Sequence, residues 1–289
     1  MSDAIINRFI DQQERADFDQ LATQLIARQV EEGVAGCELA WSELSRGDIG
    51  DWRTLPPIRS SIIPRPASPT AGSELVSSAM RAFWQTLAPA PGMPVLLLAA
   101  SEIGSTAGSL AVAIQQAVSE RGLLNPAASG KIDTLAVRSW LAARQRGGKP
   151  ATIVATAEMS GRLSRFIERR RLVFRLPTGS RLFVIGTLDA QTGDSTERPL
   201  LVDQLGLMPE FTSHIVIAPT LTTPFRIALV HREVRTLVAP PHWVRYRLAE
   251  NRLVIMDLAT TRLPACQEIG LKATPAESSN PSGGLIVQA

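Results

Sequence analysis

The chain has 289 residues, of which 45% are hydrophobic and 20% are charged. This composition excludes global disorder and allows a sizeable buried core. The formal net charge is +3, a mild excess that is spread along the chain and does not indicate nucleic-acid binding. Only two cysteines occur, which argues against a disulfide framework.

No targeting or membrane-spanning segment is recognisable in the sequence. Residues 1–15 carry acids and glutamines where a signal peptide has a basic flank and an apolar core. No apolar run approaches the ~18 residues that span a bilayer. We therefore expect a cytoplasmic protein.

The N-terminal part predicts one helix and a connector. Phe18, Leu21 and Leu25 recur at helical spacing, which predicts an amphipathic helix over residues 17–32, closed by Gly33. Residues 52–69 contain five prolines and are expected to form an extended connector or an ordered loop, since proline removes backbone donors.

From residue 73 onward, helical stretches alternate with short apolar runs, which is typical of an α/β domain whose strands are buried on both faces. The expected strands are residues 95–98, 152–155, 182–186, 214–218, 226–230 and 252–257. The expected helices are residues 73–87, 105–121, 134–144 and 159–171, with Ser160 or Glu158 available as a cap near the start of the last. We expect residues 1–69 to pack on one main domain, residues 70–272.

Two surface features complete the organisation. Arg162, Arg165 and Arg169 share one helix face, followed by Arg170 and Arg171, and a solvated surface is favoured over an anion or partner site. Residues 273–289 are rich in Pro, Ser and Gly, which predicts a flexible tail. Residues 285–287 could instead add to a sheet edge.

Two stretches carry a resemblance to a known family. Residues 18–63 contain the helix, then Trp52 and the pair Pro56 and Pro57, and residues 148–191 contain GKPATIVATAEM and the turn RLPTGS. Weaker similarities follow in the same order as far as Gly270. Together they resemble the acyl-protein synthetases of bioluminescence, a fatty-acid-activating branch of the adenylate-forming superfamily.

The resemblance implies a fold and a reaction. The fold would be like the N-terminal domain of adenylate-forming enzymes, a layered α/β structure with a mixed sheet and an N-terminal helical region, without the mobile C-terminal domain. In such enzymes ATP and Mg²⁺ activate a carboxylic acid as an acyl-adenylate, and the acyl group then passes to a thiol. The implied partners are an acyl or other carboxylic-acid ligand and an acyl-transfer protein, namely a synthetase, a reductase or a carrier protein.

The phosphate loop of the family corresponds here to Ser68, Thr70, Gly72 and Ser73. Pro69 removes a backbone donor from this run, and capping of the following helix by Thr70 or Ser73 is favoured over nucleotide binding. A second run, residues 101–109, follows a strand and opens a helix. It matches no phosphate-loop motif, so a helix cap is favoured there too, with Ser105 and Thr106 as reserve anion ligands.

The family motif YGMTE corresponds to PTLTT, residues 219–223. Thr222 keeps a hydroxyl group, Thr223 stands where the metal-binding glutamate is expected, and Pro219 replaces the aromatic residue. A neutral hydroxyl cannot supply the charge that holds Mg²⁺ on ATP phosphates. The lysine of the family motif GFKG is also missing from residues 187–190.

Three further residues are candidates for chemistry, each with a plainer alternative. Glu268 could hold ribose hydroxyls or be a surface acid in a turn, and the surface acid is favoured. Asp257 could orient a ligand or accept hydrogen bonds at a strand end. Cys266 could accept an acyl group if its pKa were lowered, although a buried, inert cysteine is the more frequent case.

Two functional hypotheses therefore stay open, and no metal-ligand set is predicted. The favoured one is a catalytically impaired or partner-dependent relative that binds an acyl or carboxylate ligand or an acyl-transfer partner. The other is an active, minimal ATP-dependent ligase. A nucleic-acid binder is discounted because the basic stretches lack interleaved aromatic residues.

Overall fold

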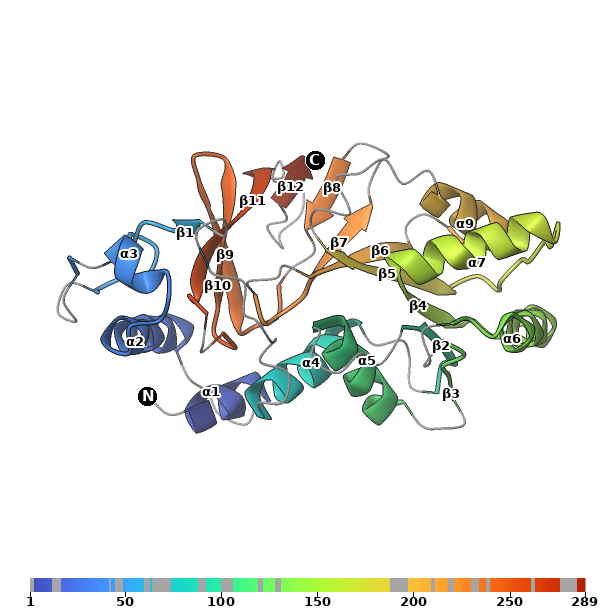
Figure 1. Ribbon diagram of the computed structural model, residues 1–289, viewed down its shortest axis with the longest axis horizontal. Coiled ribbons are helices and arrows are strands. Elements are labelled where there is room, and N and C mark those ends of the chain that lie inside the picture. The colour runs from blue at the N-terminus through green and yellow to red at the C-terminus, as the bar shows by residue number, and fades with distance from the viewer. Residues whose placement is uncertain are drawn as a thin grey trace. The chain divides into compact units, whose positions relative to one another are not determined.

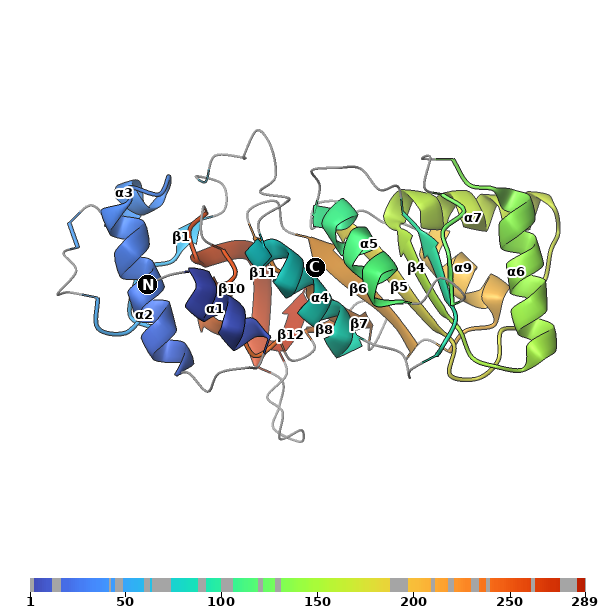
Figure 2. The ribbon, with the colours of Figure 1, turned by 90° about the horizontal axis from the view of Figure 1, so that it is seen from below.

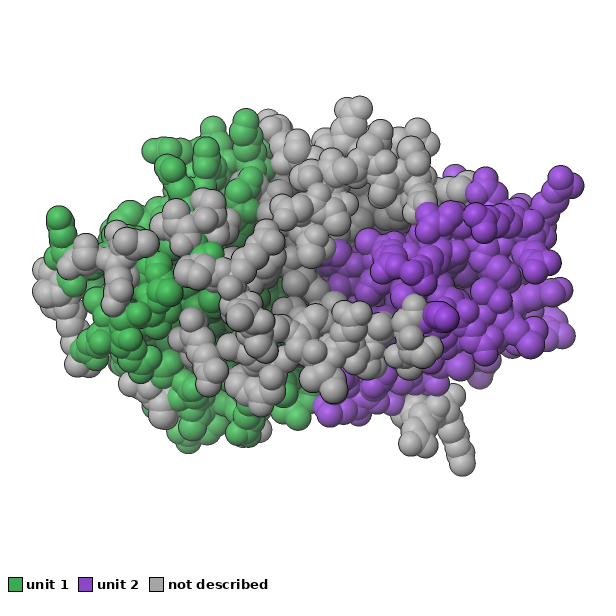
Figure 3. Space-filling model, viewed as in Figure 1, with its two compact units in different colours: residues 1–86, 218–225, 233–289 green, residues 87–217, 226–232 purple. Residues whose placement is uncertain are grey.

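The computed structural model describes residues 3–11, 17–41, 43–44, 49–59, 63, 74–87, 92–99, 106–118, 122–127, 131–187, 197–208, 211–217, 221–229, 234–237, 240–260, 263–275 and 285–288. The chain divides into two compact units, coloured separately in Figure 3. Unit 1 comprises residues 1–86, 218–225 and 233–289, and unit 2 comprises residues 87–217 and 226–232. The expected boundary between residues 69 and 70 therefore falls inside unit 1, because residues on both sides of it belong to this unit.

Unit 2 contains a largely parallel sheet, with strand order β3, β2, β4, β5, β6, β7. The pairs from β3 to β6 are all parallel, and Leu96, Ile153 and Leu182 lie side by side across three of them. The strands are β2 (Val95–Leu98), β3 (Leu123–Leu124), β4 (Thr152–Thr156), β5 (Arg181–Thr187), β6 (Thr212–Ile217) and β7 (Phe225–Leu229). The continuous apolar runs arise because such strands are buried on both faces.

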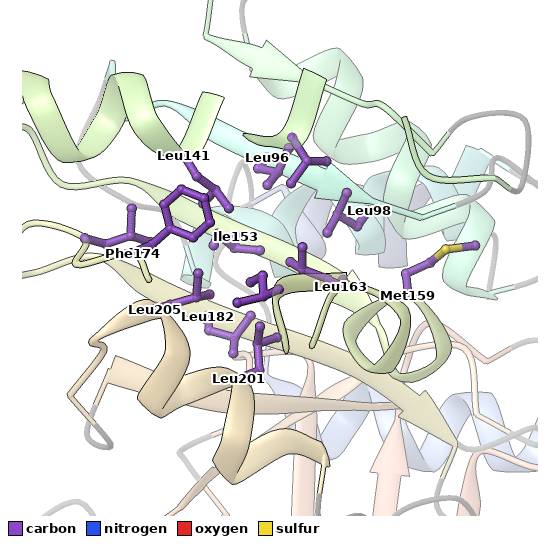
Figure 4. Packing of buried hydrophobic residues seen from close by; sticks show 14 of the residues in the cluster. Leu96, Leu98, Leu141, Ile153, Met159, Leu163, Phe174, Leu182, Leu201 and Leu205 are labelled. Carbon is purple, nitrogen blue, oxygen red and sulfur yellow. The ribbon is translucent and has the colours of Figure 1, made fainter. Parts of the chain in front are cut away.

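Three helices cover one face of this sheet (Figure 4). Leu141 of α6 (Thr134–Gly147), Leu163 of α7 (Ala157–Arg169) and Leu201 of α9 (Glu197–Leu205) pack with alternate strand residues. Those strand residues are Leu96, Leu98, Ile153, Ala155, Leu182 and Val184. Each fully buried leucine or isoleucine contributes about 1.5–3 kcal/mol, so this cluster is a main source of the stability of unit 2.

The helices of unit 2 begin and end at recognisable caps. The Asp133 side chain accepts from the backbone N–H groups of Leu135 and Ala136 at the start of α6, and Gly148 ends that helix with φ +66°. Thr156, not Ser160 or Glu158, caps α7 by accepting from Met159 N at 3.3 Å. The cap lies earlier because the helix starts at Ala157, directly after β4. A further helix of unit 2, α5 (Thr106–Ala117), begins after residues 100–105, which lie outside the described part of the chain.

Unit 1 contains an antiparallel sheet, with strand order β8, β12, β11, β10, β9. These strands are β8 (Val234–Leu237), β9 (Val244–Ala249), β10 (Arg252–Asp257), β11 (Cys266–Pro275) and β12 (Leu285–Gln288). The two-residue strand β1 (Ile58–Arg59) pairs with β11 in parallel. Glu250 and Asn251 both have positive φ, 51° and 63°, as a tight turn between β9 and β10 requires.

The N-terminal helices of unit 1 are α1 (Asp3–Ile10), α2 (Phe18–Glu31) and α3 (Cys37–Trp41), and α4 (Glu74–Leu87) follows the connector. Figures 1 and 2 show their course. Asp17 caps α2, and the apolar stripe of α2 is buried as its spacing predicts. In the connector, Trp52 Nε1 donates to Asp19 Oδ1 at 2.9 Å, which fastens it back onto α2. Within the described residues, no helix is both long and apolar enough to cross a bilayer.

The mixed α/β architecture expected from the sequence is confirmed, with a parallel part in unit 2 and an antiparallel part in unit 1. Residues 285–288 form β12, so the expected flexible tail is wrong for them. The alternative, addition to a sheet edge, is closer, although β12 lies between β11 and β8 and not at an edge. The physical reason is that the backbone groups of Leu285–Gln288 pair with β11 on one side and with β8 on the other, which satisfies their hydrogen-bonding capacity. Residues 276–284 lie outside the described part of the chain.

Candidate functional site

Asp257 is the acid at the centre of the candidate site in unit 1. It ends β10 and is fully buried. Its backbone N–H donates to the carbonyl of Ala265 at 2.9 Å, which ties the end of β10 to the start of β11. Burial removes water from the carboxyl group, so protein donors must satisfy it.

The turn before β7 supplies two of these donors through one residue. The backbone N–H of Thr223 donates to Asp257 Oδ2 at 2.8 Å, and its hydroxyl donates to Oδ1 at 2.9 Å. Thr223 is itself buried, with 4% of its surface exposed. The two sequence-predicted residues Thr223 and Asp257 are therefore in direct contact.

The segment after β10 supplies the other donors. Ala259 N donates to Asp257 Oδ1 and Thr260 Oγ1 donates to Oδ2, both at 3.0 Å. Thr222 joins through its backbone N–H, which donates to Thr260 Oγ1 at 3.3 Å, and the buried indole of Trp243 donates to Thr223 Oγ1 at 3.0 Å. We call these six residues the Asp257 network: Thr222, Thr223, Trp243, Asp257, Ala259 and Thr260.

Burial and hydrogen bonding act in opposite directions on the pKa of Asp257. Burial disfavours the charged carboxylate and raises the pKa above its ordinary value. Hydrogen bonds from Thr223, Ala259 and Thr260 lower the pKa and offset part of this effect. The net direction is upward, because the carboxyl group is completely removed from water.

The oxygens of Asp257 do not fit the magnesium ion that the family resemblance implies. A carboxylate offers about four lone-pair sites, and here each oxygen already accepts two hydrogen bonds from the protein. Mg²⁺ needs oxygen ligands at roughly 2.0–2.1 Å in near-octahedral geometry. Thr223, which the resemblance matches to the metal-binding glutamate, has its hydroxyl engaged with Asp257 and Trp243. Among the described residues, no three His, Cys, Asp or Glu side chains gather as a metal-ligand set.

Cys266 is buried at the start of β11, opposite Met256 of β10. Burial raises the pKa of its thiol to about 11, although Arg247 acts in the opposite direction. Burial likewise raises the pKa of Cys37 to about 12, with Cys266 adding to the effect. Both groups are therefore neutral thiols near pH 7, and a neutral thiol is a poor nucleophile.

Gln29 of α2 lies in the same region of unit 1 and organises the loop before β11. Its amide group donates to the carbonyls of Thr260 and Leu263 and accepts from Ala265 N at 2.9 Å. The side chain is fully buried. Gln29 thus holds the loop that carries Thr260 into the Asp257 network.

Glu268 lies on β11, where it pairs with Val254 of β10. It is not a member of the Asp257 network. It forms an ion pair with Arg252 at 2.7 Å. The favoured alternative, a surface acid in a turn, is wrong, because Glu268 is buried within a strand and its carboxylate pairs with Arg252.

Several predicted site residues cannot be placed. Ser68, Thr70, Gly72, Ser73 and Ser105 lie outside the described residues, as do residues 188–190. Thr106 begins α5, but its side chain is also outside them. Their assignment as phosphate ligands or caps stays a prediction.

Three members of this region were not predicted from the sequence, namely Trp243, Thr260 and Gln29. Gln29 offered a signal, because it follows the buried residues Leu25 and Ile26 on the apolar stripe of α2. A polar residue on such a stripe is expected to bond with a buried backbone group. Trp243 gave no local signal, because its partner Thr223 lies twenty residues earlier in the chain. Thr260 bonds the nearby Asp257, but it also accepts from the remote Thr222 N, a contact that no local pattern predicts.

Comparison with known proteins identifies the fold. No protein-family model matches the chain, and a comparison with curated protein sequences finds no match. Among solved structures, the chain is similar to a 2-hydroxyisobutyryl-CoA ligase in its open conformation, in complex with 2-HIB-AMP and CoA. The identity is 10%, the TM-score is 0.58, and the alignment covers 91% of this chain and 66% of the ligase.

A second structure of this ligase, in the thioesterification state, gives 11% identity and a TM-score of 0.56 over 93% of this chain and 67% of the ligase. An amide bond synthetase from Marinactinospora thermotolerans gives 10% identity and a TM-score of 0.44, covering 74% of this chain and 45% of the synthetase. This chain thus spans about two thirds of the length of the CoA ligase. It has the α/β fold of the N-terminal part of adenylate-forming enzymes, as expected.

Proposed function

We propose that this chain is a divergent, acyl-protein-synthetase-like member of the adenylate-forming superfamily that does not adenylate carboxylic acids on its own. It uses the inherited scaffold to bind an acyl or other carboxylic-acid ligand, or a protein partner in acyl transfer. Partners of this kind are a synthetase, a reductase or a carrier protein. The proposal concerns activity and goes beyond the fold.

The observation that supports it most is the contact between Thr223 and Asp257. In an adenylating enzyme an acid at the position of Thr223 would hold Mg²⁺ on the phosphates of ATP. Here a hydroxyl stands in that position, and it bonds Asp257 and Trp243 inside a buried network. A group with this role stabilises the fold and has no free oxygen to offer a cation.

The alternative is an active ATP-dependent ligase that passes an acyl group to a thiol. Its support is the likeness in fold to a ligase in complex with 2-HIB-AMP and CoA. In that case ATP and Mg²⁺ would be cofactors, and Cys266 would be the candidate acyl acceptor. The burial and the raised pKa of Cys266 weigh against the last assignment.

Isothermal titration calorimetry with Mg·ATP distinguishes the proposed non-adenylating protein from an active ligase. We expect no binding up to about 1 mM nucleotide, the upper end of ordinary substrate constants. A panel of fatty and short-chain carboxylic acids, added without ATP, should raise the melting temperature if the scaffold still binds such ligands. An intact carboxylate-activating ligase serves as the positive control, and saturable Mg·ATP binding by this chain would favour the active ligase.

A further inference from the structure

The positive charge of the chain is more concentrated than the overall composition suggests. Residues 131–187 carry twelve Lys and Arg against three Asp and Glu, a formal excess of nine, whereas the whole chain has a net charge of +3. This segment is fully described and belongs to unit 2. The expectation of an evenly spread excess is therefore wrong, because residues 131–187 hold a much larger positive excess than the chain as a whole.

An open hollow of about 420 Å³ lies within this basic segment. One wall is a single face of α6, where Arg138, Ala142, Gln145 and Arg146 recur at helical spacing. The other wall is the chain that follows α7, formed by Leu172, Val173 and Phe174. Both helices are labelled in Figure 2.

The walls of the hollow are held in place by hydrogen bonds. Arg175 N donates to Gln145 Oε1 at 3.1 Å, which joins the two walls directly. Leu172 N donates to the carbonyl of Ile167 at 3.0 Å, and Phe174 N donates to that of Gln204 at 3.3 Å. The hollow is therefore largely formed before any partner arrives, which reduces the ordering cost of binding.

The wall of the hollow that follows α7 is apolar, and the wall on α6 carries two basic residues, Arg138 and Arg146, which we call the rim. Val173 is 76% exposed, the largest fraction among the exposed large hydrophobic residues in the described part of the chain. Arg138 and Arg146 are both exposed, and neither forms an ion pair with another described residue. They are eight residues apart on α6, which is about 12 Å along the helix axis.

We propose that this hollow is the docking site for an acidic amphipathic helix of a partner protein. An apolar side chain of that helix would lie against Val173 and Leu172, and two of its carboxylates would pair with Arg138 and Arg146. A nucleic acid is disfavoured because Trp140 is the only aromatic side chain of α6, and its ring already stacks with Arg144 at 5.8 Å. The site uses residues of unit 2 alone, so it does not depend on the function proposed for the Asp257 network.

The probe for this site is a fluorescein-labelled amphipathic peptide of about 18 residues, with Leu on one helical face and Glu elsewhere. Binding to the full chain is followed by fluorescence anisotropy at low and at high salt. A scrambled peptide of the same composition and a single-stranded RNA of similar net charge are measured alongside it. The folded state of every variant is checked by its melting temperature.

Two matched pairs of variants separate docking from general attraction. Arg138→Gln with Arg146→Gln removes two charges from the rim, and Arg162→Gln with Arg165→Gln removes two exposed charges from α7 outside the hollow. Val173→Ser removes the apolar contact, and Leu135→Ser changes a residue of similar exposure, 71%, that does not line the hollow. The first member of each pair should weaken peptide binding by about tenfold or more, and the second should change it less than about twofold.

Three results would overturn the proposal. One is the absence of peptide binding even at low salt. Another is equal weakening by both members of a pair, which would show attraction to net charge only. The third is tighter binding of the RNA or the scrambled peptide than of the amphipathic peptide, which would show a nucleic-acid or non-specific basic surface.

Discussion

Thr223 donates two hydrogen bonds to Asp257, one from its backbone N–H at 2.8 Å and one from its hydroxyl at 2.9 Å. The pair joins the turn before β7 to the end of β10, two segments that are distant in sequence. Threonine can make both bonds because its hydroxyl lies close to its own N–H. Glutamate at this position would bring a second buried carboxylate toward Asp257, where like charges repel.

Removing the hydroxyl of Thr223 should destabilise unit 1. Thr223→Val would leave Trp243 without its acceptor and Asp257 with one donor fewer, both in a buried site. The unsatisfied indole N–H costs about 1–3 kcal/mol and the lost hydrogen bond to Asp257 about 1 kcal/mol, so we expect a loss of about 2–4 kcal/mol in the free energy of unfolding. Urea denaturation of the variant and the wild-type protein measures this loss in the free energy of unfolding.

Thr223→Ser is the matched control, because it keeps the hydroxyl group and loses only a methyl. It should cost about 1 kcal/mol, close to the value for one buried methylene. Equal stability of the valine variant and the wild-type protein would contradict the assigned role of the hydroxyl.

The pH dependence of stability should report the raised pKa of Asp257. Because the pKa in the folded state lies above the ordinary value of 3.8, the folded state holds its proton to higher pH than the unfolded state. The free energy of unfolding contributed by this group therefore falls as the pH rises from 3.8 to the folded pKa.

The measurement compares the wild-type protein with Asp257→Asn by urea denaturation between about pH 4 and 7. The stability of the wild-type protein relative to the variant should decrease with increasing pH. A relative stability that increases with pH would mean that the hydrogen bonds outweigh burial and that the pKa is lowered.

Both cysteines should resist thiol reagents in the native state. Burial keeps the pKa of Cys37 and Cys266 at about 12 and about 11, so almost no thiolate is present at pH 8. A disulfide reagent should label them only at the rate of unfolding, and should label two thiols at once in denaturant. Rapid labelling of one native thiol, lost in Cys266→Ser but retained in Cys37→Ser, would restore Cys266 as a candidate acyl acceptor.

The sequence predicted those elements whose signal is local. β2 and β10 have the predicted bounds because their apolar runs are closed by turn residues or a polar end. α2, α4 and α6 were also recognised, since apolar spacing and caps lie within each segment. These patterns depend on the residues themselves and not on a distant partner.

β9 was missed although its partner β10 follows directly along the chain. β9 carries Arg245 and Arg247, and its turn contains Glu250 and Asn251 without the glycine that usually marks a hairpin. For β12, addition of residues 285–287 to a sheet edge was named as the alternative, but pairing with both β11 and β8 was not predicted. The same limit applies to the site, because Thr223 and Asp257 were each singled out but their contact was not predicted.

Carboxylate-dependent exchange of pyrophosphate into ATP tests the central claim most directly, because exchange requires a reversible acyl-adenylate. With a panel of fatty and short-chain carboxylic acids and Mg²⁺, we predict no exchange above a blank without protein. An intact carboxylate-activating ligase confirms that the assay works. Exchange that depends on a carboxylic acid and follows the protein through gel filtration would contradict the account, and would show that the chain activates carboxylates despite Thr223.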